Sequence, residues 1–188
     1  MRLIGKKVML RAPEETDLSV LHEWANEPSI WALLGSWRFA SNFESAKAWF
    51  QGLGKDPAHQ RYVIVRADTR ELIGTANLVD IDMKNGTAFH GMMLGPASAR
   101  GKGFATDTVM TVMRYAFDEL RLERLDSDII EYNQASLKLY LERCGWKEEG
   151  RQRGWHYRQG RRWDRVIVGV TRADYQDLLH KTAYWDRT

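Results

Sequence analysis

The chain has 188 residues, of which 44% are hydrophobic and 28% are charged, and its formal net charge is +3. This composition is ordinary for a globular protein with one core. The charge is too small to argue for nucleic acid, and no apolar run approaches the length of a membrane helix, so we expect neither DNA nor a membrane as partner.

The single cysteine, Cys144, excludes an internal disulfide and suits a reducing compartment. The first residues have no long apolar core that would indicate a signal peptide. We therefore expect a cytoplasmic protein and one domain spanning residues 1–188, with no metal site.

The first half of the chain alternates short strands and amphipathic helices. Val8–Arg11 indicates a strand, and Thr16-Asp17 begins a helix that stops at residues 26–28. After an aromatic-rich segment at residues 30–39, a second helix capped near Ser41-Asn42 carries its apolar residues between 43 and 50. Residues 62–65 and 72–78 indicate two strands.

The centre of the chain is a strand, a glycine turn and a long helix. Asn85-Gly86 is a hairpin signal, and residues 88–94 form an apolar run typical of a buried strand. Residues 104–120 place apolar side chains three and four apart, which indicates a helix with one buried face. Gly101 and Gly103 lie between them, and free N–H groups at the start of a helix favour an anion such as a phosphate.

The second half continues with a strand at 125–130, a helix at 135–143 ended by Gly145, and a hairpin of residues 146–155 and 163–170 that turns at 158–160. Strands on both sides of inserted helices predict an α+β fold with a mostly antiparallel sheet.

Two motifs carry a family resemblance. Arg-x-x-Gly-x-Ala at Arg100–Ala105 resembles the pyrophosphate loop of the GCN5-related N-acetyltransferases (GNAT superfamily). Downstream, Asn133, Ser136, Tyr140 and Gly145-Trp146 match the spacing of that family's second cofactor segment. The tail at residues 160–175 is similar to the branch that holds ribosomal-protein N-terminal, spermidine and amino-sugar acetyltransferases.

The resemblance implies acetyl-CoA (coenzyme A) as cofactor, bound where two central strands splay apart. Pantetheine would pair with the first of these strands, the loop would bind the pyrophosphate, and Asn133 would reach the cofactor from the other side or simply cap the following helix. The cofactor-binding residues that we expect are Met92, Met93, Leu94, Arg100, Gly101, Lys102, Gly103, Phe104, Ala105, Thr106, Asn133, Ser136 and Tyr140.

The implied chemistry is attack of a neutral amine on a thioester, which needs a base, an oxyanion donor and an acid. Tyr140 matches the family's usual acid, with Ser136 as the alternative donor, and a backbone N–H at Met93 or Leu94 would meet the oxyanion. No single residue is assigned as the general base, because Phe89 stands where many relatives have glutamate. His90 is the nearest titratable group, and Asp80, Asp82, Glu131 and water are the other options.

The sequence does not identify the acceptor amine and indicates only which residues surround it. Trp31 and Trp37 lie on the segment that shapes the acceptor cleft in similar enzymes, and with Asp80 and Glu131 they are our expected substrate-binding residues. We expect a small-molecule amine such as an amino sugar, aminoglycoside or polyamine. A protein N-terminus and a coenzyme A-binding module without turnover are the alternatives, and a homodimer is left open.

Overall fold

The computed structural model describes residues 2–35 and 39–186, and within them the strands form a single sheet. The strands are β1 (Arg2–Ile4), β2 (Val8–Arg11), β3 (Gln60–Arg66), β4 (Leu72–Asp82), β5 (Thr87–Leu94), β6 (Arg124–Ile130), β7 (Lys147–Arg158) and β8 (Arg161–Thr171). They are ordered β1-β2-β3-β4-β5-β6-β8-β7, and every neighbouring pair except β5–β6 is antiparallel. The predicted α+β class with a mostly antiparallel sheet is confirmed.

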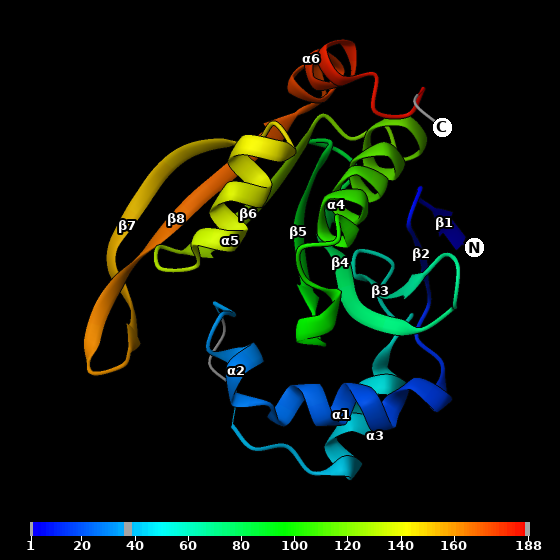
Figure 1. The fold of residues 1–188 in the computed structure, drawn as a ribbon, viewed down its shortest axis with the longest axis vertical. Coiled ribbons are helices and arrows are strands. Elements are labelled where there is room, and N and C mark those ends of the chain that lie inside the picture. Colours follow the sequence, from blue (N-terminus) through cyan, green and yellow to red (C-terminus); the bar gives the residue numbers. More distant parts are fainter. Residues whose placement is uncertain (1, 36–38, 187–188) are drawn as a thin grey trace.

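The α-helices are α1 (Leu18–Asn26), α2 (Pro28–Trp31), α3 (Phe43–Gly52), α4 (Phe104–Arg114), α5 (Gln134–Leu137) and α6 (Arg172–Thr182). Short π-helical turns at Tyr115–Glu119 and Lys138–Arg143 extend α4 and α5. In Figure 1, α1, α2 and α3 gather below one end of the sheet, while α4 and α5 lie nearer its centre. None of the described helices is long and apolar enough to cross a bilayer.

The expected splay in the sheet lies between β5 and β6. Parallel pairing joins Thr87 to Arg124 and continues only as far as Phe89 and Asp126. Beyond that point β5 runs on to Leu94 while β6 runs to Ile130. Because neither strand has a partner on this side there, their inner edges are open to a ligand.

Helix α4 packs its apolar face on the sheet and also anchors the amino-terminal turn. Val109, Val112 and Met113 are fully buried in the core. The buried Asp107 carboxylate accepts hydrogen bonds from the backbone N–H groups of residues 6, 7 and 8 at 3.0, 2.7 and 2.9 Å, and from the Tyr184 hydroxyl at 2.8 Å. These bonds fix the β1–β2 turn beside the first turn of α4.

Candidate active site

A large cleft of about 1520 Å³ opens where β5 and β6 diverge. Helices α1 and α2 contribute residues to one wall, and the start of α4 contributes residues at one end. Residues of α5 line the cleft together with residues of β6. Of the predicted cofactor residues, those that line the cleft are Met92, Met93, Leu94, Arg100, Gly101, Gly103, Ala105, Thr106, Asn133, Ser136 and Tyr140. The cleft therefore brings together segments that lie far apart in the sequence.

The backbone of β5 offers hydrogen-bonding groups to this cleft at alternate residues. Gly91 N–H is directed to the Asn77 side chain on β4 at 2.9 Å, and Gly95 N–H to the Ile73 carbonyl at 3.0 Å. Because these directions alternate along a strand, Met92 and Leu94 direct their backbone groups to the open side, whereas Met93 directs its own to β4. Of the two backbone N–H groups predicted to donate to the oxyanion, that of Leu94 faces the cleft and that of Met93 does not.

The glycine loop is shaped as an anion site. Gly101 and Gly103 have φ values of 75° and 85°, and a Cβ atom at Gly101 would have no neighbour within 4 Å. Gly103 is the N-cap of α4, so the N–H groups of the next three residues have no partner inside the helix. Two predicted loop residues do not line the cleft: Phe104 is buried and Lys102 is exposed.

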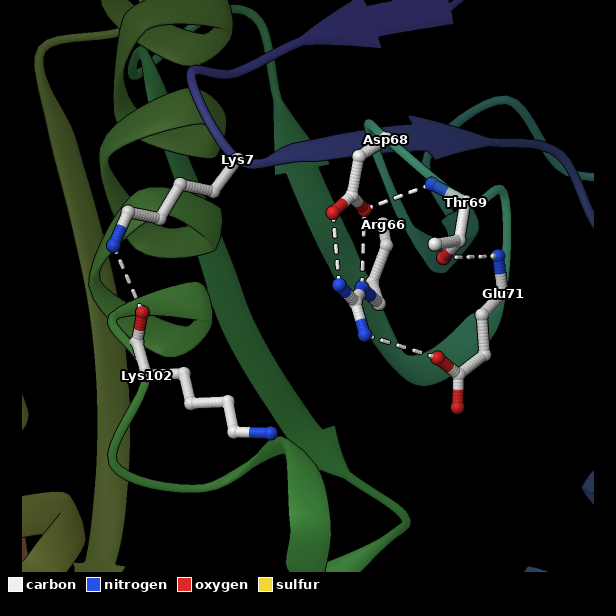
Figure 2. A network of polar contacts seen from close by, with 6 residues as sticks. All are labelled: Lys7, Arg66, Asp68, Thr69, Glu71 and Lys102. Atoms are coloured by element: carbon white, nitrogen blue, oxygen red, sulfur yellow. Dashed lines mark hydrogen bonds and ion pairs between the residues drawn. The ribbon is translucent and has the colours of Figure 1, made fainter.

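Lys7 supports this loop from outside the motif. Its Nζ donates to the Lys102 carbonyl at 2.9 Å, as Figure 2 shows. Since the 102–103 peptide is trans, its carbonyl and the N–H of Gly103 point in opposite directions. Lys7 therefore fixes the direction of that N–H and adds a positive charge near the loop.

Arg66, which is also drawn in Figure 2, is held by a neighbouring turn instead. Arg66 pairs with Asp68 at 2.8 Å and with Glu71 at 3.4 Å, and the guanidinium lowers the pKa of Asp68 to about 2. Its charge is therefore largely balanced within that turn. Lys7 is the better electrostatic support for an anion at the loop.

We expect Lys7→Met to raise the KM for acetyl-CoA about threefold to fivefold, close to 1 kcal/mol, with kcat nearly unchanged. The variant loses one positive charge near the loop and the hydrogen bond that fixes the direction of the Lys102 carbonyl. Steady-state kinetics at low and high salt measure it, and the exposed Lys102→Met is the matched control. A larger effect from the Lys102 variant would contradict this assignment.

Tyr140 lies in the π-helical turn after α5 and lines the cleft while being only 3% exposed. Its ring packs edge-on against Trp146 at a centroid distance of 4.9 Å. Burial raises the pKa of the Tyr140 phenol, and a hydrogen bond with Ser127 opposes that effect. The hydroxyl is therefore protonated at neutral pH, as a proton donor must be.

Asn133 caps α5, as one of its two expected roles requires. Its Oδ1 accepts the Ser136 N–H at 3.2 Å, and its Nδ2 donates to the Leu33 carbonyl at 3.2 Å. Both Asn133 and Ser136 line the cleft. Their contact with a cofactor and the alternative donor role of Ser136 stay predictions.

His90 does not lie in the cleft. The imidazole is fully buried beside Tyr140 and Trp146, and its Nδ1 bonds the Asn77 carbonyl at 2.8 Å. Burial lowers its pKa to about 4. Because the residue is sealed from the space where an amine would arrive, the geometry disfavours the predicted role of His90 as base.

The predicted substrate residues fall in different places. Trp31, at the end of α2, lines the cleft, while Trp37 lies outside the described residues. Asp80 is exposed and contacts His59 at 3.2 Å, and Glu131 accepts a hydrogen bond from the backbone of Asp164. Neither Asp80 nor Glu131 lines the cleft, so the structure does not bring these two carboxylates to the site.

Three polar residues that are not among the expected site residues also line the cleft. Asp128 on β6 accepts from Arg165 of β8 at 2.7 Å, and His156 of β7 lies beside them. For Asp128 the sequence signal was the alternation in β6, which puts Asp126 and Asp128 on the face opposite Leu125 and Ser127. For Arg165 and His156 it was the cluster of arginine and aromatic residues in the last hairpin.

Known proteins resemble the chain over most of its length. A family model described as "Acetyltransferase (GNAT) domain" matches residues 7–147. An uncharacterized N-acetyltransferase of the SPbeta prophage in Bacillus subtilis is 28% identical, covering 92% of this chain and 94% of the relative. An uncharacterized N-acetyltransferase (p20) of Bacillus licheniformis is also 28% identical, covering 92% and 97%.

Among solved structures, a spermidine N-acetyltransferase from Vibrio cholerae, in complex with CoA and spermine, superposes with a TM-score of 0.83. It is 25% identical, and the match covers 92% of this chain and 99% of that one. The similarity therefore extends over most of the fold.

Proposed function

The chain belongs to the acetyltransferase (GNAT) domain family, and on that premise we propose that it transfers an acetyl group from acetyl-CoA to the primary amine of a small molecule. The observation that carries the proposal is the continuous cleft from the glycine loop, through the gap between β5 and β6, to Tyr140. We also propose that residues 1–188 work as one catalytic domain, because the sheet continues from β1 to β7.

The residues of the cleft fit coenzyme A. The loop around Gly101 combines open space, left-handed glycines and the free N–H groups of a helix start, which together suit a pyrophosphate. Met92 and Leu94 offer unpaired backbone groups to an amide-bearing arm. Arg100 and Arg143 add positive charge to the lining.

Acetyl-CoA supplies an acyl carbon activated as a thioester. The chain's own part is to position donors around that carbon and to exclude water. In the proposed reaction the backbone N–H of Leu94 would stabilise negative charge on the carbonyl oxygen, and the protonated Tyr140 hydroxyl would give a proton to the departing sulfur.

The charges of the cleft favour an acceptor with a single ammonium. Among the described residues that line it, Asp128 is the one carboxylate. The cations of the lining are Arg61, Arg100, Lys138, Arg143 and Arg165. A polyamine would need more negative charge than this, although the similarity to an enzyme solved with spermine keeps polyamines in the test.

The test is a panel of amines with acetyl-CoA and detection of free thiol. The panel contains glucosamine, kanamycin, spermidine and a short peptide with a free N-terminus. We expect the amino sugar to give a higher kcat/KM than spermidine. Preference for the peptide would assign a protein N-terminus instead, and no thiol release with any amine would overturn the proposal.

A further inference from the structure

The side of the cleft that carries Phe89 also carries a compact polar cluster. Phe89 pairs with Asp126 across the β5–β6 ladder, and Asp128 follows two residues later on the same face of β6. A carboxylate therefore lies on the same side of the cleft as Phe89, which stands where many relatives have glutamate. It comes from the opposite strand of the splay.

Arg165 holds this carboxylate by one oxygen only. Its guanidinium donates to Asp128 Oδ1 at 2.7 Å and also to Gln152 at 3.3 Å. The Asp128 side chain is 13% exposed, so its charge is mostly shielded from water by protein. The second oxygen, Oδ2, faces the segment at Gly35.

Gly35 lies close to both that oxygen and His156. A Cβ atom built on Gly35 would lie 3.1 Å from Asp128 Oδ2 and 3.6 Å from His156 Cε1. Gly35, Asp128 Oδ2 and the edge of the His156 ring therefore lie close together on the wall of the cleft. A small cationic group in the cleft beside them would meet the carboxylate.

The His156 ring has a nitrogen without a partner. The residue is 5% exposed, and its Nε2 is buried with no hydrogen-bond partner among the described residues. A buried polar atom of this kind is rare in proteins unless a ligand or water completes it. His156 and Asp128 both line the cleft, unlike His90, so a ligand there would lie against the imidazole, and the buried Nε2 would become exposed to bond it.

We propose that Asp128 and His156 form the ammonium site of the acceptor, in which Asp128 Oδ2 binds the charged amine and His156 Nε2 removes its proton. This inference rests on the proposed function and names the residues that act on its substrate. It replaces the missing glutamate at Phe89 with groups from β6 and β7.

The protonation state of His156 is consistent with this role. Burial lowers the pKa of the imidazole, Asp128 raises it, and Arg158 and Arg165 lower it further. The ring is therefore neutral at neutral pH and free to accept a proton. On acidification below its pKa the ring becomes charged, so the rate must fall on the acid side.

The cluster and the acid lie on opposite faces of β6. Ser127, which bonds Tyr140, and Asp128 are consecutive residues and so point to opposite faces of the strand. The ammonium gives one proton to His156, and its nitrogen lone pair then forms the C–N bond as the C–S bond breaks. The sulfur takes its proton from Tyr140, which regains one from the nitrogen through the cleft's water.

The test uses the best amine of the panel and four variants of the full chain. We expect Asp128→Asn to raise the amine KM about tenfold with the KM for acetyl-CoA unchanged. His156→Gln should lower kcat/KM about tenfold at pH 7.5 and remove the acid limb of the pH profile, which lies below ~6.5 in the wild type.

Gly35→Ala places a Cβ atom 3.1 Å from Asp128 Oδ2, so it crowds that oxygen without removing the charge and tests the site even if Asp128→Asn folds poorly. We expect about a threefold rise in amine KM, and no change for Gly150→Ala, where an added Cβ meets no atom within 4 Å. An NMR titration gives a readout without turnover: loss of the Asp128 charge should lower the pKa of His156.

The outcomes separate the two proposals. If no amine is acetylated by the wild type, the proposed function fails and this inference fails with it. If the wild type is active but the amine KM and the acid limb survive in Asp128→Asn, His156→Gln and Gly35→Ala, only the assignment of the ammonium site is overturned.

Discussion

Replacing Tyr140 with phenylalanine should lower kcat about 100-fold while the affinity for acetyl-CoA stays nearly unchanged. Phenylalanine keeps the ring that packs on Trp146 and removes only the hydroxyl. Without that proton the sulfur must leave as a thiolate. Because burial raises the pKa of the Tyr140 phenol, the wild type should show no alkaline loss of kcat from this group below about pH 10.

Single-turnover kinetics and calorimetry on the same variant separate chemistry from binding. Ser136→Ala is the control, since Ser136 is the alternative donor and lines the same cleft. We expect it to retain at least about a third of kcat. If Tyr140→Phe stays within a factor of two of wild type and Ser136→Ala does not, the donor is Ser136.

The sequence predicted the elements whose signals are local. The strand at Val8–Arg11, the helix beginning after Asn42 and the hairpin turning at residues 158–160 all occur, because caps, glycines and apolar periodicity act over a few residues. The Arg158–Arg161 hairpin has both central residues at positive φ, which its Gln-Gly turn allows.

Three elements were missed because their signals are weak. β1 has three residues and α2 has four, so neither is long enough to repeat its periodic pattern. The larger omission is α6, whose polar sequence has little amphipathic contrast. Its start was nevertheless marked by the capping box of Thr171 and Asp174, which the structure shows in full.

The residues of the site also divide into those predicted from local sequence signals and those that only the fold brings together. The glycine loop and the Asn133–Tyr140 segment were found because each is a contiguous motif. The Asp128–Arg165 pair, by contrast, spans 37 residues and exists only because β6 and β8 are neighbours in the sheet. His90 and Glu131 were chosen for proximity in sequence, and the pleat and the β6–β8 contact take them elsewhere.

The second large effect is expected at the loop, where Gly103→Val should weaken acetyl-CoA binding about thirtyfold, or ~2 kcal/mol. Gly103 has a φ of 85°, a conformation that a β-branched residue avoids. Its Cβ would also lie 3.1 Å from Lys7 Nζ, so the side chain would disturb the contact that orients the loop.

Calorimetry with coenzyme A measures the loss, and circular dichroism checks that the variant is folded. Gly150→Val is the matched control, because an added Cβ there meets nothing within 4 Å and the residue lies on β7 away from the loop. We expect the control to bind like the wild type. Unchanged affinity in a folded Gly103→Val protein would remove the loop from the binding site, because the left-handed backbone and the anion approach could not both persist with valine at this position.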